Sequence, residues 1–189
     1  MKRTVLLILS LLFMVVASSE FTYAKSSKQP SQSKPQTTQS YKGKPVTVVK
    51  SSKPKSVAKL PATKYPIKHN GVEYYRSGSK FYKNVNGRFV LTVLPFGLRV
   101  PIIPAVHTIF RFNNINYYSS EGVIYQEAGN NEYVVVEPQV GMVVPELPMV
   151  NVSEVSIDNM IYFEFDGILY KQIPTVSGLQ YEVVGTLSR

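Results

Sequence analysis

The sequence predicts an all-β fold built from three tandem β-meander units, similar in size to SH3 modules, that follow a disordered basic spacer. A tyrosine-rich stretch recurs three times, beginning at Ile67, Phe110 and Val155, and such repetition is typical of arrays of small structural units. Within each copy, runs of β-branched and aromatic residues alternate with pairs of Asn, Asp and Gly. No stretch after residue 66 has a capped helical period of apolar residues, so we expect little helix.

The first 24 residues have the pattern of a signal peptide. Lys2 and Arg3 precede an apolar stretch over residues 4–17, shorter than the roughly 20 residues that a membrane-spanning helix needs. We expect cleavage after Ala24, where the composition changes; a second small-x-small site ends at Ser19, and an uncleaved anchor is the alternative. The protein is therefore expected to be exported: periplasmic, associated with the outer envelope, or secreted.

Residues 25–66 are expected to form a disordered, extended linker. They contain ten lysines and no acidic residue, and Ser, Pro, Gln and Thr dominate the rest, a composition that buries too little apolar surface to fold. Two roles stay open for this linker. It is either a solubilising tether or a basic segment that contacts an anionic membrane or glycan surface, in which case the contact weakens with salt.

Charge and cysteine content narrow the classes of function. Residues 67–189 hold nine Lys or Arg and eleven Asp or Glu, so the basic character of the chain lies in the linker. A folded nucleic-acid reader carries a basic face of its own, and we therefore expect no nucleic-acid partner. The chain has no Cys, which excludes disulfides, thiolate metal sites, thiol nucleophiles and a lipoprotein anchor.

The three repeat units are bounded at residues 67–109, 110–154 and 155–189. Asn, Asp and Gly tolerate the positive φ of tight hairpin turns, and they recur between the expected strands. The first turns are expected at Asn70-Gly71, Asn113-Asn114 and Asp158-Asn159, the second at Gly78, Gly122 and Gly167, and the third at Asn86-Gly87, Asn130-Asn131 and Ser177-Gly178.

A proline-containing tail follows the first two units. It reads PFGLRVPIIP from Pro95 and PQVGMVVPELP from Pro138. Proline cannot donate to a strand ladder, so we interpret each tail as an extended crossover to the next unit rather than a central strand. The third unit lacks a tail and is expected to be a truncated, terminal copy.

These motifs resemble a known family. The combination of NG-V-x-YY, an aromatic residue before a valine run, P-x-x-G and VPxLP is similar to the uncharacterised secreted repeat proteins of Bacteroidetes, catalogued as a domain of unknown function. The resemblance covers roughly residues 67–185 and is strongest in the second unit; the first has Leu91-Thr92-Val93 in place of the valine run. It implies a secreted or envelope location and no particular activity.

The adjacent aromatic residues are the candidate ligand-binding residues. Neighbours in a strand point to opposite faces, and the first member of each pair is expected to share a face with Val72, Ile115 or Met160. Which face forms the core stays open. An exposed aromatic row could stack on sugar rings or bind an extended peptide; the alternative is cross-strand packing that stabilises the sheet. The candidates are Tyr74, Tyr75, Tyr117, Tyr118 and Tyr162, with Phe163 beside the last.

Catalysis has few candidate residues. His69 and His107 are the two histidines, and neither recurs in the other units or has a zinc or nucleophile spacing around it. Asp158, Glu164 and Asp166 lie close together in the third unit, a grouping that suggests calcium ligands. Turn chemistry explains both aspartates, however, and no calcium-binding pattern accompanies them. We expect no enzyme activity, cofactor or metal. Two function classes remain: a binding module for cell-wall glycan or an envelope protein, and a structural component that self-associates through its sheet edges.

Overall fold

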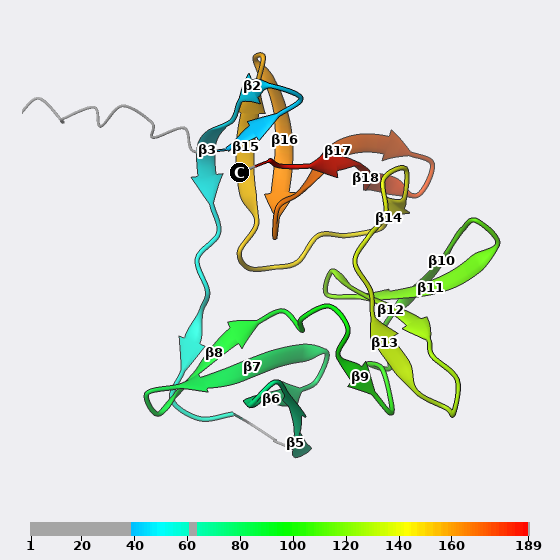
Figure 1. Cartoon of the computed structure of the whole chain (residues 1–189). Coiled ribbons are helices and arrows are strands. Elements are labelled where there is room, and N and C mark those ends of the chain that lie inside the picture. The colour runs from blue at the N-terminus through cyan, green and yellow to red at the C-terminus, as the bar shows by residue number, and fades with distance from the viewer. Residues whose placement is uncertain (1–38, 61–63, 189) are drawn as a thin grey trace, which may run out of the picture. The chain divides into compact units, whose positions relative to one another are not determined.

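The strands of the described residues form three large antiparallel sheets, each built around one four-stranded meander, and a separate two-stranded hairpin (Figure 1). The computed structural model describes residues 39–60 and 64–188, which belong to one unit spanning residues 34–189. No helix occurs in the described ranges, so the all-β prediction is confirmed; consequently none is present there that could cross a membrane. The predicted signal peptide and residues 25–38 of the predicted linker lie outside the described residues.

The first sheet has the strand order β4-β8-β7-β6-β5, the second β10-β11-β12-β13-β9, and the third β14-β18-β17-β16-β15-β3. The first comprises β4 (Ser56–Val57), β5 (Lys64–His69), β6 (Val72–Ser77), β7 (Lys80–Val85) and β8 (Arg88–Thr92). The second comprises β9 (Arg99–Val100), β10 (Thr108–Phe112), β11 (Ile115–Ser120), β12 (Val123–Glu127) and β13 (Tyr133–Val135). The third comprises β3 (Thr47–Ser51), β14 (Val143–Val144), β15 (Ser153–Ile157), β16 (Met160–Phe165), β17 (Ile168–Thr175) and β18 (Gly178–Thr186). A separate hairpin pairs β1 (Ser40–Tyr41) with β2 (Lys44–Pro45).

The predicted turns connect these strands, except that the last turn of the third unit lies at Val176-Ser177 and Gly178 already begins β18. In the first turn of each unit both central residues have positive φ, for example 46° at Asn70 and 77° at Gly71. This is the combination that a two-residue type I′ hairpin requires. The same holds at Asn113-Asn114 and Asp158-Asn159, which places the strand boundaries and therefore the register of each meander.

Each proline tail supplies an edge strand to the sheet that follows it. The first tail contains β9, which pairs with β13 of the second sheet, and the second contains β14, which pairs with β18 of the third. Pro101 and Pro145 come directly after these two-residue strands, where the missing N–H interrupts further pairing. The prediction that the tails are not central strands is confirmed, and they also join neighbouring sheets.

The predicted disordered linker is corrected over residues 39–60, which form four strands, and over residues 64–66, which begin β5. Here β4 pairs with β8 at the edge position that β9 and β14 occupy in the other sheets. Val46 and Leu60 are only 4% and 5% exposed. Strands added at a sheet edge are held mainly by backbone hydrogen bonds. The two buried side chains are therefore enough to fix this segment, although its composition is too polar to form a core of its own.

The third unit forms the same four-stranded meander as the other two, and the N-terminal segment adds a further strand to it. Its sheet has six strands, and β3 lies along the outer edge of β15. The backbone of Ser40 pairs in both directions with Ser188, at N–O distances of 3.0 and 2.9 Å, and the Tyr41 hydroxyl donates to the Val184 carbonyl at 2.8 Å. Residues 39–60 thus contact the third sheet through β3 and the first through β4 (Figure 1).

The sheets pack in sequence through opposite faces. We name face A the side of each sheet that carries Tyr74, Tyr117 or Tyr162, and face B the side that carries Tyr75, Tyr118 or Phe163. Three buried clusters follow one rule: face A of one sheet packs on face B of the next, and face A of the third packs on the N-terminal segment. Members of the clusters include Tyr74 and Phe81 with Val123, Tyr125 and Val135; Tyr117 and Ile124 with Tyr170 and Val183; and Val155 and Leu169 with Val46.

Candidate functional site

One aromatic pair recurs on face B of all three sheets. Its ring centroids lie 5.2 Å apart in Tyr75–Phe89, 5.5 Å in Tyr118–Tyr133 and 5.5 Å in Phe163–Tyr181, with interplanar angles between 81° and 88°. Edge-to-face contact places the positive ring edge on the negative face of its neighbour. The recurrence shows that each repeat builds the same local aromatic structure.

The surroundings of this pair differ among the three sheets. In the second and third sheets it packs against clusters that include residues of the preceding sheet, and the adjacent Tyr125 and Tyr170 are 0% and 3% exposed. In the first sheet, Tyr75, Tyr82 and Phe89 are half-buried and belong to no buried cluster of the described residues. Face B of the first sheet therefore lacks the covering sheet that the other two have.

Polar residues lie on the same face, as expected for a face that no other sheet covers. Lys80 occupies the position of Val123 and Ile168, whose side chains are buried at 4% and 1% exposure. Asn84 is exposed, and Val57, opposite Phe89 in the ladder, is 38% exposed. We call this surface the first aromatic face; its members are Val57, Lys68, Glu73, Tyr75, Lys80, Tyr82, Asn84, Phe89 and Leu91. Leu91, opposite Tyr82, is buried at 8% exposure, and it lines a small hollow with Lys80 and with Met149 and Val150 of the second crossover. This end of the face is therefore covered in part.

A short polar chain orients Tyr75. The Tyr75 hydroxyl donates to Glu73 Oε2 at 2.7 Å, and Lys68 Nζ lies 3.4 Å from Glu73 Oε1. The hydrogen bond from Tyr75, followed by that from Lys68, lowers the pKa of Glu73, and the same bond to Glu73 raises the pKa of Tyr75. At neutral pH the carboxylate is therefore ionised and the phenol is neutral, which favours one ring orientation.

The predicted candidates separate into different environments. Tyr74 and Tyr117 are buried at 9% and 3% exposure, so face A is the core side at these positions. Tyr162 packs against Tyr41, with ring centroids 6.5 Å apart. Tyr118 is half-buried between Tyr133 and His107. Only Tyr75 of the five lies on the first aromatic face.

Sequence reasoning missed Tyr82, Phe89 and Lys80. Strand register is the signal that finds them. The turn at Gly78 places Tyr82 opposite Tyr75 in the β6–β7 ladder, and directly opposed residues share a face. The substitution of Lys80 for the Val and Ile of the other copies is also visible in the sequence.

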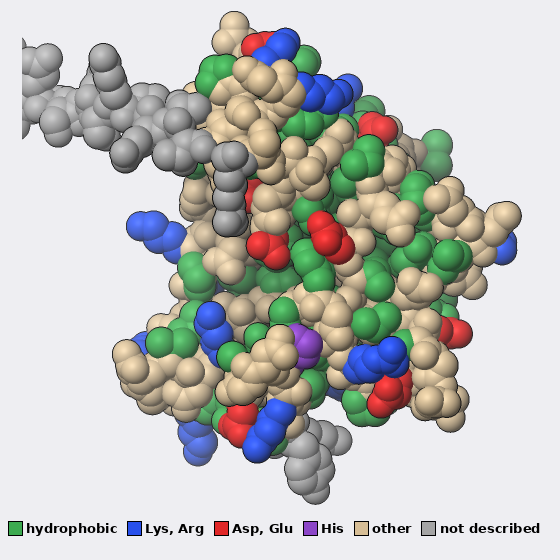
Figure 2. Space-filling model, in the orientation of Figure 1, with side chains coloured by type: hydrophobic (Ala, Val, Ile, Leu, Met, Phe, Trp, Pro, Cys, Tyr) green, Lys and Arg blue, Asp and Glu red, His purple; other side chains and the backbone are tan. Residues whose placement is uncertain are grey.

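Charge is distributed unevenly along the described fold. Residues 52–94 carry nine Lys or Arg and one Glu, whereas residues 95–189 carry four Lys or Arg and ten Asp or Glu. The slight acidity predicted for residues 67–189, a net charge of −2, combines +4 over residues 67–94 with −6 over residues 95–189. Several Lys and Arg side chains are visible at the lower left of Figure 2, where Figure 1 shows β5–β8. Among the basic residues between positions 52 and 94, only Lys68 forms an ion pair within the described part of the chain.

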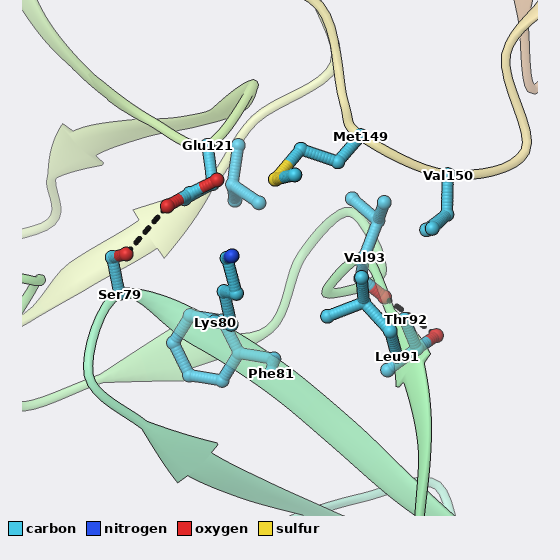
Figure 3. A pocket seen from close by; sticks show the side chains of 10 residues that line it. Ser79, Lys80, Phe81, Leu91, Thr92, Val93, Glu121, Met149 and Val150 are labelled. Atoms are coloured by element: carbon cyan, nitrogen blue, oxygen red, sulfur yellow. Dashed lines mark hydrogen bonds between the residues drawn. The ribbon is translucent and has the colours of Figure 1, made fainter. Parts of the chain in front are cut away.

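The hollows in the structure do not form a second candidate site. The one in Figure 3 lies between the β6–β7 turn and the crossover at Met149 and Val150; Ser79 Oγ donates to Glu121 Oε1 there at 2.6 Å. Its volume of about 20 Å³ suits a single water. A larger open hollow of about 300 Å³ is lined by residues 92–96, Asn151, Phe165 and Asp166, with Asp166 its one charged residue.

The residues considered for metal binding or catalysis have local structural contacts. Glu164 Oε1 accepts from the Gly167 N–H at 2.7 Å, and Asp158 forms an ion pair with Lys44. His107 Nδ1 lies 2.8 Å from the Pro104 carbonyl. Within residues 39–60 and 64–188, no three His, Asp or Glu residues are grouped as a metal site.

Comparison with known proteins gives a family and no activity. The model of a family of unknown function, DUF6515, matches residues 36–186. The chain belongs to this family. The match begins before β1 and ends at the last residue of β18, so DUF6515 includes the N-terminal segment that the sequence reasoning assigned to the linker. No curated protein and no solved structure matches the chain.

Proposed function

We propose that this protein is an exported, non-catalytic binding module whose first aromatic face binds an acidic glycan of the cell envelope. The observation that carries the proposal is the aromatic pair Tyr75–Phe89, which lacks the covering sheet of its two counterparts and has Lys80 beside it. Buried Val and Ile at the position of Lys80 in the other copies show that the difference is in the sequence as well as in the packing.

The chemistry of this face matches that ligand class. Aromatic rings contact the apolar faces of sugar rings, and Tyr82 with the edge-to-face Tyr75–Phe89 pair provides an apolar strip contributed by β6, β7 and β8. Lys68 and Lys80 supply cations on the same face, and the net positive charge of residues 52–94 attracts a polyanion from a distance. An envelope protein with an acidic, extended segment is the second ligand that these features would fit.

The export signal and the basic segment complete the proposal. We take residues 1–24 as a cleaved signal peptide, so that the protein acts in the periplasm, at the outer envelope or outside the cell. Residues 25–38 contain three lysines and no acidic residue, and we take them as a tether that contacts an anionic membrane or glycan surface. Both points derive from the sequence.

Retention on an immobilised polyuronate tests the ligand class. We expect the purified protein to bind the polyuronate, to bind its neutral counterpart more weakly, and to elute as salt rises. Tyr82→Leu keeps an apolar side chain but removes the ring, and we expect about a tenfold loss of affinity. Lys80→Ala should give a comparable loss at low salt.

Matched controls separate binding from general damage. Lys171→Ala removes an exposed lysine of the third sheet, and Leu179→Ala shortens a side chain that is 60% exposed; both should bind as the unmodified protein does. Equal binding by Tyr82→Leu and the unmodified protein would exclude the first aromatic face. Retention on single-stranded DNA without retention on the polyuronate would replace the glycan with a nucleic acid, because basic aromatic surfaces also bind single strands.

A further inference from the structure

The first strand of each meander forms the outer edge of its four-stranded repeat. These strands are β5, β10 and β15. In the third sheet β3 covers β15, whereas β5 and β10 are terminal strands of their sheets in the described structure. A terminal strand presents unpaired N–H and C=O groups, which can pair with another chain.

The β3–β15 ladder shows that this edge accepts an added antiparallel strand. Thr47, Val48 and Lys50 pair with Ser156, Val155 and Glu154, and a register shift lies between Glu154 and Val155. Two side-chain contacts end the ladder, with the Ser51 and Ser153 hydroxyls 3.0 Å apart and the Ser52 Oγ donating to the Val152 carbonyl at 3.1 Å. The added strand comes from a segment about 100 residues away, so the pairing is independent of chain continuity.

The two open edges differ in how they resist pairing. The sequence of β5 is KYPIKH, and Pro and Lys on an edge oppose pairing by removing a donor and by keeping charge in water. The sequence of β10 is TIFRF, which has one charge and no Pro. Ile109 is 59% exposed in this strand, and Ile102 and Val106 in the preceding crossover are 64% and 80% exposed. The β10 edge is therefore apolar and unprotected.

We infer that β10 pairs with β10 of a second copy, antiparallel and around a two-fold axis, to join two second sheets into one. When β10 pairs with β10 of a second copy, the same residues of both copies provide the backbone hydrogen bonds, as an isologous interface requires. The single Arg111 per strand gives little repulsion, and Ile109 of each copy would leave water. The inference is independent of the proposed glycan site, because β10 belongs to the second sheet and the first aromatic face to the first.

Sedimentation of the purified protein over a concentration range tests this pairing. We expect a reversible dimer with a dissociation constant of roughly 10–100 µM, as suits a small interface. Ile109→Lys places two ammonium groups at the joined edge and should shift the protein to monomer, with at least a tenfold weaker association. Leu179→Lys changes a side chain of nearly equal exposure in the β17–β18 hairpin of the third sheet, and should leave the dimer unchanged.

Three outcomes would overturn the inference. The first is a protein that stays monomeric up to roughly 0.5 mM, well above the expected dissociation constant. The second is an equal effect of Ile109→Lys and Leu179→Lys, which would indicate a general charge effect. The third is a monomer that binds a peptide of residues 46–52 at the β10 edge, since the occupant would then be a strand like β3 and not β10. Melting curves of both variants should match the parent, because both side chains are exposed.

Discussion

Face B of the first sheet and face B of the third have the same aromatic structure in different surroundings. Tyr75–Phe89 and Phe163–Tyr181 have nearly equal centroid distances and angles. The third pair packs in a core shared with the second sheet, whereas the first has no such cover among the described residues. One repeated motif therefore contributes to the core in the second and third copies and to the surface in the first.

The difference teaches how an array can keep one sequence pattern and still have distinct ends. At the trailing end, face A of the third sheet is covered by the N-terminal segment through Val46 and Tyr41. At the leading end, face B of the first sheet has Lys80 in place of a buried aliphatic residue. Terminal repeats of arrays generally need polar outer faces. Here the outer face of the third sheet is covered by the N-terminal segment, and the outer face of the first sheet has a lysine in place of an aliphatic residue.

The largest test of this comparison replaces the same tyrosine in the two sheets. Tyr170→Ala removes a side chain that is 3% exposed, and we expect a loss of about 3–5 kcal/mol in the free energy of unfolding, the usual cost of a large buried aromatic. Tyr82→Ala removes the half-buried counterpart and should cost about 1 kcal/mol. Urea denaturation followed by circular dichroism measures both.

A third variant serves as the reference for that pair. Tyr125→Ala in the second sheet, at 0% exposure, should cost as much as Tyr170→Ala. Equal losses for Tyr82 and Tyr170 would contradict the comparison, because they would mean that the first aromatic face is covered as fully as the third.

A smaller test compares two turn glycines. Gly78 and Gly122 both have positive φ, 63° and 76°, so an alanine at either position costs about 1–2 kcal/mol from the left-handed conformation. At Gly122 an added Cβ would also overlap the backbone of Leu147 and Pro148, whereas nothing lies within 4 Å of a Cβ at Gly78. Gly122→Ala should therefore destabilise the protein by at least about 1 kcal/mol more than Gly78→Ala.

Thermal melting of the two alanine variants distinguishes the two contributions. A common decrease in Tm would show that only the backbone conformation matters and that the second tail does not rest on the β11–β12 turn. A larger decrease for Gly122→Ala would support the packing of the crossover on its own unit. The unmodified protein is the reference for both.

The hairpins could be predicted from the sequence because their chemistry is local. Asn70-Gly71 and Asp158-Asn159 specify positive φ without help from the rest of the fold. The N-terminal strands could not be predicted from composition, because β3 and β4 are held by edges that other segments provide. One signal was available: Val57-Ala58-Lys59-Leu60-Pro61 has the spacing of Val144-Pro145-Glu146-Leu147-Pro148 in the second tail.

The candidate site could be predicted only in part for a related reason. Alternation places Tyr74 and Tyr75 on opposite faces, but it does not say which face another sheet will cover. That depends on where a copy stands in the array: Tyr125 and Tyr82 occupy the same position in their repeats, but Tyr125 is 0% exposed whereas Tyr82 is half-buried. The order of packing, and not the motif, determines exposure.

The smallest expected effect concerns the Tyr125 hydroxyl. It is buried, and no hydrogen-bond partner is present for it in the described structure. An unpaired buried hydroxyl has lost its hydration without compensation. Tyr125→Phe should therefore leave the free energy of unfolding unchanged or raise it by about 1 kcal/mol at neutral pH, and urea denaturation at pH 7 measures this. A clear loss of stability would show that the hydroxyl has a partner.

The same variant carries a pH dependence of known sign. Burial raises the pKa of Tyr125 above its ordinary value of 10.0, so the folded state holds this proton more tightly than the unfolded state does. The associated stability is present below pH 10 and is lost as pH rises above it, by about 1.4 kcal/mol per pH unit. Tyr125→Phe removes this loss, so its advantage over the parent should grow between pH 10 and 11. Because burial also raises the pKa of Tyr170, the Tyr125→Phe variant should still lose some stability at alkaline pH. If the free energy of unfolding of parent and variant changed with pH in parallel, the burial of Tyr125 between the first and second sheets would be contradicted.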